Sequence, residues 1–196
     1  MLLSQKMLLD KGKSLIDDFC SLNNLPVPGI IEYTKEDWKV EHCAYYRHSI
    51  IHICISSCAK AASGEKDIRN WNWPGSVTDR TPLGVLAHEL GHHCDVLLSQ
   101  NQGKYSGDFS DLIRMESGEL PISSYSPNTG EWFAEYFRLF LTNPQLLRCV
   151  RPNTYTLLTQ HFTPCIRKDW LKTLGKKCPM RIKRALINKM KIKGVA

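Results

Sequence analysis

Residues 87–95 of this 196-residue chain read AHELGHHCD, and this stretch decides which fold the sequence predicts. It lies inside a helix predicted over 82–98, because a capping threonine and a proline, both favoured where helices begin, precede the first apolar residues. Four residues advance a helix by about 400°, so His92 returns to within about 40° of His88. The two imidazoles therefore project from one face, where a single metal ion can contact both.

The segment from His88 to His92 is an HExxH motif, which on a helix indicates a zinc peptidase. Two neutral imidazoles and an open coordination position suit Zn²⁺, and Glu89 on the adjoining flank is placed to accept a proton from water. A solvated helix that carries histidines by chance is the alternative, but three histidines within six residues lack a packing reason. His93, about 140° from His88, is expected to face polar groups elsewhere. Asp95 is expected to lie beside the metal ligands without binding the ion itself.

A catalytic zinc site needs a third protein ligand. A metzincin places Gly three and His six residues after the second histidine, whereas this chain has Asp95 and Leu98 there, so that class is excluded. The strongest candidates are Glu131 and Glu135, which share one face of a helix predicted over 129–141.

The surroundings of these two carboxylates favour a metal. The rest of their helix is almost entirely aromatic and aliphatic, and an unpaired buried charge is costly. A metal on one glutamate and a ligand histidine on the other would neutralise both, whereas a salt bridge to Arg138 is the plainer alternative. Spacing leaves open which glutamate binds, and His161 is the remaining histidine that can replace Glu131 as third ligand.

Two blocks of the sequence resemble a known family. The string HELGHHCD at 88–95, and SSY ending at Tyr125 followed closely by EWFAEYFRL, are similar to the gluzincin-like peptidases related to the catalytic domain of anthrax lethal factor. The resemblance covers roughly residues 80–160. It implies that Glu131 is the third zinc ligand, that Glu135 orients a ligand histidine, and that Tyr125 donates to the developing oxyanion. The interval from Tyr125 to Glu131 is one residue shorter than in the family.

The whole chain predicts an α+β, zincin-like fold with a small N-terminal mixed sheet, the active-site helix and a helical C-terminal half. An amphipathic helix is expected over the first twenty residues, with a stop marked by Asn23 and Asn24, and further helices are expected to about Phe162. Short strands are expected at 30–34 and 49–56, the latter with isoleucines alternating on one face. Zincins bind substrate along an edge strand above the active-site helix. Residues 49–56 are the candidate for that edge, with a central strand as the alternative.

Positive charge is concentrated at the C-terminal end. Residues 166–196 hold eleven Lys or Arg against one Asp, a net charge of +10 that exceeds the +7 of the whole chain. We divide the sequence into a metallopeptidase domain at 1–165 and a basic helical extension at 166–196, packed on the same domain. The extension permits a weak anionic partner such as nucleic acid, with a solvated face as the plainer interpretation.

Lys6 interrupts the apolar N-terminus and further charges follow from Asp10 on, so we expect no signal peptide, no membrane span and a cytoplasmic protein. The eight cysteines then read as reduced thiols. A second metal site is an option that no CxxC pair supports. Its candidate ligands are Cys43, Cys54, Cys58, His42, His48 and His52.

Together these features predict a monomeric zinc metalloendopeptidase that binds one Zn²⁺ and hydrolyses peptide bonds of a protein or peptide substrate. His88, His92 and Glu131 are the expected ligands, with Glu89 as general base. The second hypothesis is a catalytically inactive zincin-like fold that binds nucleic acid or a protein through its basic tail. The biological setting stays open between a phage or mobile-element protein, an effector and a housekeeping enzyme.

Overall fold

The architecture is α+β, as predicted, with a three-stranded sheet, four α-helices and a two-stranded ribbon among the described residues. The computed structural model describes residues 4–58, 71–72, 76–77, 80–102, 109, 111–112, 115–116, 129–142, 144, 147–148 and 151–165. The helices are α1 (Gln5–Leu22), α2 (Pro82–Gln102), α4 (Thr129–Thr142) and α6 (Pro152–His161). The sheet strands are β1 (Gly29–Glu32), β2 (Ala44–Arg47) and β3 (Ile50–Ile53), and the ribbon pairs β4 (Trp71–Asn72) with β5 (Ser76–Val77).

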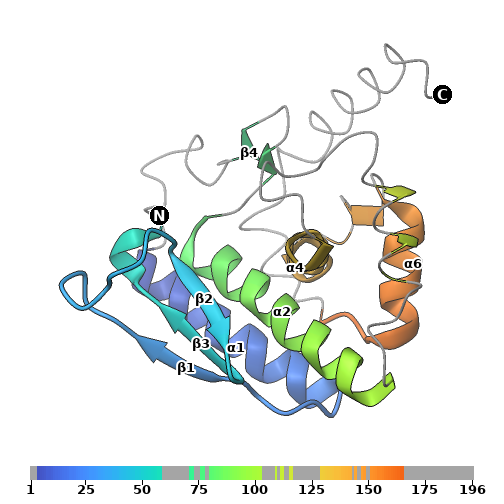
Figure 1. Ribbon diagram of the computed structural model, residues 1–196, viewed down its shortest axis with the longest axis horizontal. Coiled ribbons are helices and arrows are strands. Elements are labelled where there is room, and N and C mark those ends of the chain that lie inside the picture. The colour runs from blue at the N-terminus through green and yellow to red at the C-terminus, as the bar shows by residue number, and fades with distance from the viewer. Residues whose placement is uncertain are drawn as a thin grey trace.

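Helix α2 is the central element of the fold. It packs against α1, against β2 of the sheet and, on another side, against α4, which in turn contacts α6. Figure 1 shows α1 and α2 running side by side along the sheet, with α4 seen end-on beyond α2. The motif-bearing helix therefore lies between an edge strand and a second helix, and side chains from both can reach its polar face.

Helix α1 forms because its apolar residues recur at helical spacing and its ends are capped. The Ser4 hydroxyl accepts a hydrogen bond from the Met7 amide, and the predicted stop holds, since Asn23 caps the last turn. Its buried residues include Leu9, Leu15 and Phe19, which join the common core with α2 and α4. Burial of this apolar face provides most of the helix's stability.

The sheet has the order β1-β3-β2 and is mixed, because β1 runs parallel to β3 and β2 antiparallel to it. A two-residue turn joins β2 to β3. His48 and Ser49 in this turn have φ angles of 50° and 61°, the left-handed conformation that a tight hairpin requires of both its central residues. Arg47 therefore pairs directly with Ile50, which fixes the register of the hairpin.

Of the two options for residues 49–56, the central strand is confirmed and the edge strand is wrong. β3 is the central strand and spans only Ile50–Ile53, because the chain turns into a 3₁₀-helix, η1 (Ile55–Ser57), directly afterwards. Ile51 and Ile53 face the core as expected, whereas Ile55 lies in the 3₁₀-turn and not on the strand. The strand beside α2 is β2, and pairing from both sides is what places β3 in the middle.

The α2–α4 seam depends on close backbone approach at Gly91. A Cβ placed there would lie 2.7 Å from Ala134 Cα, 3.1 Å from Phe137 Cβ and 3.2 Å from the Ala134 carbonyl oxygen. Backbone atoms cannot move aside as a flexible side chain can. The glycine inside the HExxH motif therefore sets how near α4 lies to the two histidines.

Gly91→Ala is expected to destabilise the fold by about 1–3 kcal/mol through overpacking, and to weaken metal binding because α4 is pushed away. Thermal unfolding and zinc titration measure the two effects. Gly12→Ala is the matched control at the α1–α2 contact, where the nearest atom, at 2.6 Å, is the end of the Leu86 side chain. We expect a smaller stability loss there and unchanged zinc affinity; equal effects on zinc would contradict the role of Gly91.

One expectation is not addressed by these elements. The basic extension at 166–196 lies outside the described residues, so its packing on the domain stays a prediction. Within the described part of the chain, no helix combines the length and the apolar character needed to cross a bilayer.

Candidate metal centre

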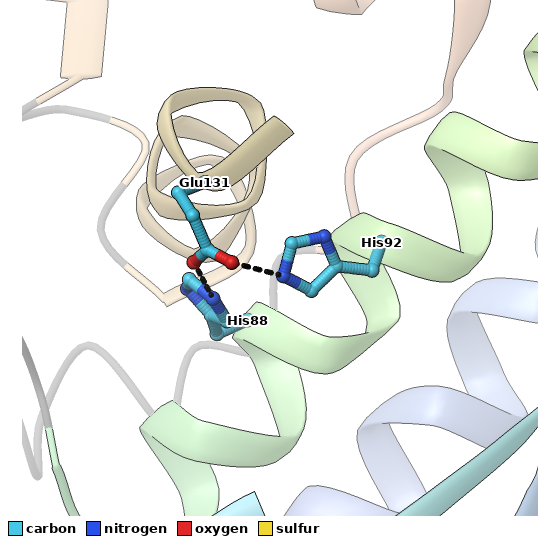
Figure 2. Close-up of side chains that lie close together, drawn as sticks. All are labelled: His88, His92 and Glu131. Carbon is cyan, nitrogen blue, oxygen red and sulfur yellow. Dashed lines mark hydrogen bonds and ion pairs between the residues drawn. The ribbon is translucent and has the colours of Figure 1, made fainter. Parts of the chain in front are cut away.

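The two histidines of the motif meet Glu131 at the seam between α2 and α4 (Figure 2). His88 and His92 lie one turn apart on α2, with ring centroids 4.9 Å apart, and Glu131 extends toward both from the first turn of α4. Its carboxylate oxygens lie 3.1 Å from His88 Nε2 and 3.5 Å from His92 Nε2. One ligand atom from each residue lies within 4.8 Å of the others.

This donor set fits zinc. Imidazole nitrogens and a carboxylate oxygen are ligands that zinc favours, and ligand atoms around a tetrahedral zinc lie about 3.3 Å apart. The two nitrogen–oxygen distances of 3.1 and 3.5 Å, each to a different oxygen of Glu131, lie on either side of that value. Among the described residues the group has three members, which leaves a coordination position for water or substrate, as catalytic zinc sites require.

Glu135 contacts His88 from the other side of its ring. Its Oε1 lies 2.8 Å from His88 Nδ1, and the Arg138 guanidinium donates to both Glu135 oxygens at 2.9 and 3.2 Å. Glu135 and Arg138 are 1% and 0% exposed. Glu135 thus contacts both groups that the sequence analysis considered as its partners, a histidine of the motif, His88, and Arg138. Because Nδ1–H donates to Glu135, Nε2 is the His88 atom directed at the ligand position.

The ionisable groups of the centre shift one another's pKa. Burial alone would lower the pKa of His88, but hydrogen bonds with Glu131 and Glu135 outweigh it and raise this pKa to about 10. The hydrogen bonds to His88 and His92 hold the pKa of Glu131 well below its ordinary value. A cation bound at Nε2 of His88 would require this nitrogen to carry no proton.

Glu89 lies beside the ligands but is not one of the group of three. Its side chain is 6% exposed and lines the same cavity as both histidines. Burial raises the pKa of Glu89, while the neighbouring charges of His88 and His92 oppose the rise. A raised pKa suits a carboxylate that accepts and then returns a proton near neutral pH.

A cavity of about 310 Å³ opens over the motif between α2 and β2. Asp95 and Val96 extend its α2 wall beyond the motif, and burial raises the pKa of Asp95 to about 6 against the opposing charge of His92. The full lining consists of His42, Ala44, Tyr46, His88, Glu89, His92, Asp95, Val96 and Glu131. The ligand group and an edge strand therefore share one cavity.

Two further predicted site residues have different outcomes. Tyr125, the expected oxyanion donor, lies outside the described residues. His161, the alternative third ligand, lies on α6 against Phe109, with ring centroids 5.1 Å apart, and is not a member of the ligand group. Among the described residues, the group that could hold a metal therefore takes its carboxylate from α4.

The residues considered for a second metal site form no second group of three at ligand distance within the described part of the chain. Cys43 Sγ donates to the Ser57 carbonyl at 3.1 Å. His52 Nδ1 lies 2.9 Å from the Tyr33 hydroxyl, and its ring stacks on Tyr45 at 4.5 Å between centroids. These side chains pack the sheet and the turn that follows it.

Tyr46 on β2 is a site residue that sequence reasoning missed. Its hydroxyl lies 3.0 Å from Nδ1 of His93, and His93 Nε2 lies 2.8 Å from the Pro26 carbonyl oxygen. The Tyr46 hydroxyl and the Pro26 carbonyl are thus polar groups of the kind that His93 was expected to face. The aromatic pair Tyr45-Tyr46 just before the strongest strand pattern was the available signal, because aromatic residues favour strands.

Comparison with protein-family models, with curated proteins and with solved structures finds no match for this chain. Its function must therefore be inferred from the side chains gathered at the α2–α4 seam and in the cavity beside β2.

Proposed function

We propose that the protein is a zinc-dependent metallopeptidase of gluzincin type with a zincin-like fold. One observation carries the proposal: a carboxylate from a separate helix lies 3.1 and 3.5 Å from the two histidines of an HExxH motif. An HExxH sequence that arose by chance in a helix has no reason to meet Glu131 in this way. The accompanying buried contact from Glu135 to His88 further matches a ligand histidine held in one orientation.

Each residue has a distinct role in peptide hydrolysis. His88, His92 and Glu131 would hold zinc, which supplies Lewis-acid activation of water and of a substrate carbonyl. Glu89 accepts the proton of the attacking water on its carboxylate and delivers it to the leaving amine nitrogen. Glu135 accepts the Nδ1–H of His88 and so keeps Nε2 directed at the ligand position.

β2 supplies the surface along which a peptide substrate would extend. One edge of β2 pairs with β3, and in the described sheet no strand follows on its other edge. Ala44 and Tyr46 of this strand line the cavity over the motif. An extended peptide added to β2 by main-chain hydrogen bonds would cross the ligand group. β2 thereby takes the role for which residues 49–56 were the sequence candidate.

The alternative of an inactive fold that binds nucleic acid through its tail depends on residues 166–196. These residues lie outside the described part of the chain, so this stays a prediction. Binding of DNA or RNA measured against salt concentration separates it from the peptidase, because phosphate contacts weaken steeply as salt rises.

Purified protein is expected to bind zinc at one ion per chain and to cleave peptides only while the metal is bound. Cleavage of a proteome-derived peptide library by zinc-loaded, chelator-treated and zinc-restored protein, read by mass spectrometry, tests this. The double variant His88→Ala, His92→Ala should lose zinc and cleavage, whereas the control His161→Ala should keep both. Failure of the unaltered protein to bind zinc, or cleavage that survives in the double variant, would contradict the proposal.

A further inference from the structure

Tyr46, His93 and the Pro26 carbonyl are linked by hydrogen bonds, and Tyr46 is one of the residues that line the candidate active-site cavity. The three groups come from β2, from α2 and from the connection between α1 and β1. His93 is 1% exposed, and Tyr46 lines the cavity together with Glu89 and the ligand histidines. The series of hydrogen bonds is therefore held at its buried end by the Pro26 carbonyl, and Tyr46 is its member that lines the cavity.

The chemistry of the buried end decides where each proton lies. A carbonyl oxygen can only accept, so Nε2 of His93 must carry a hydrogen and donate it to Pro26. A second proton on Nδ1 would leave a buried imidazolium between a carbonyl and a hydroxyl, neither of which is charged. His93 is therefore the neutral Nε2–H tautomer, and its Nδ1 accepts the hydrogen of the Tyr46 hydroxyl 3.0 Å away.

This direction of donation determines what Tyr46 can offer to a ligand. A phenol has one hydrogen to donate, and here that hydrogen is engaged by His93. The oxygen retains acceptor capacity, and the residue that carries it lines the cavity. Tyr46 can therefore receive an N–H group without breaking its bond to His93, whereas donating to an oxyanion would require breaking that bond.

We propose that Tyr46 binds substrate by accepting a hydrogen bond from a peptide N–H group, and that His93 is the positioning residue that keeps Tyr46 an acceptor. The inference rests on the proposed peptidase function and extends it to how a peptide is held. Because Tyr46 lies on the strand proposed to pair with the substrate, a bound main chain would bring N–H groups past its side chain. Its role is therefore in binding, and the oxyanion must be stabilised by other groups.

The neighbouring tyrosine offers a matched control. Successive residues of a strand face opposite sides of the sheet, so Tyr45 points away from the cavity and stacks on His52. Tyr45→Phe and Tyr46→Phe each remove one hydroxyl from the same strand. Only Tyr46→Phe should change the affinity for a ligand that binds in the cavity.

Binding of two hydroxamates to zinc-loaded protein tests the proposal without relying on catalysis. Acetohydroxamic acid reports the metal alone, and an N-acyl dipeptide hydroxamate adds peptide N–H groups. In Tyr46→Phe we expect affinity for the dipeptide compound to fall about tenfold, with zinc content and acetohydroxamic acid affinity unchanged. Tyr45→Phe should match the unaltered protein. Methylating each amide nitrogen of the compound in turn should identify one analogue whose affinity Tyr46→Phe no longer changes.

Variants of His93 separate positioning from packing. Gln can accept from Tyr46 and donate to Pro26, so His93→Gln should keep the dipeptide affinity within about twofold. His93→Leu can do neither and should lose about as much affinity as Tyr46→Phe. Nitrogen-15 NMR of the histidine rings, which depends neither on metal nor on activity, should show His93 protonated on Nε2 alone.

Each result bears on a definite claim. If the unaltered protein does not bind acetohydroxamic acid, the proposed function fails and this inference fails with it. If acetohydroxamic acid binds but Tyr46→Phe leaves the dipeptide affinity unchanged, the inference alone is wrong. A proton on Nδ1 of His93, or a loss in His93→Gln as large as in His93→Leu, would likewise overturn it.

Discussion

Glu89→Gln is expected to abolish peptide hydrolysis while zinc stays bound. Glutamine has the size and shape of glutamate but cannot accept a proton, and Glu89 lies outside the ligand group, so the metal loses no ligand. Loss of a general base lowers the rate by about 10²–10⁴-fold. The value of kcat/KM on the most rapidly cleaved library peptide and the zinc content of the same sample, measured together, test this.

Glu36→Gln is the control for this substitution, because it makes the same chemical change at an exposed position away from the cavity. It should leave both hydrolysis and zinc content as they are. Activity retained by Glu89→Gln would refute the assignment of the proton acceptor. Zinc lost from Glu89→Gln would show instead that this carboxylate takes part in holding the metal.

Zinc affinity is expected to fall far more in Glu131→Ala than in Glu135→Gln. Glu131 is the carboxylate within ligand distance of both histidines, so its removal leaves two protein ligands. Glu135 acts through the Nδ1–H of His88, and loss of such an orienting partner weakens metal binding by about 10–100-fold. Competition with a chromophoric chelator measures both affinities. The reverse order would assign Glu135 as the ligand.

Protein stability provides a second readout that separates the same two glutamates. Glu135→Gln removes the carboxylate that accepts two hydrogen bonds from the buried Arg138 guanidinium, and breaking a buried pair in this way costs about 3–5 kcal/mol. Glu131 is half-buried and pairs with histidines instead of an arginine. Its replacement should change the unfolding free energy less. Equal losses in the two variants would contradict the pairing of Glu135 with Arg138.

The helices could be predicted from sequence because their signals are local. The cap and proline before α2 placed its start at Pro82, and its end differed only in extending to Gln102. Apolar spacing and the stop at Asn23 placed α1, and the aromatic run placed α4 to within a residue of its observed end. In each case neighbours within one or two turns contain the information.

Strand order could not be predicted in the same way. β2 and β3 are joined by a two-residue turn, but nothing in the Ile50–Ile53 segment indicates that β1, from an earlier part of the chain, pairs with its other edge and makes it the central strand. The cavity and the Tyr46–His93 contact depend on a second non-local contact, since β2 must lie beside α2 before its side chain can meet the helix. Both were therefore beyond sequence reasoning.

Two imidazoles share a face of α2 and two carboxylates share a face of α4, and both facts can be read from the sequence because helical geometry fixes which residues lie together within an element. Which carboxylate meets both imidazoles depends instead on how the two helices pack together. Close approach at Gly91 brings the first turn of α4 to His88 and His92, so Glu131 reaches the ligand position. Glu135, one turn further on, is left between His88 and Arg138.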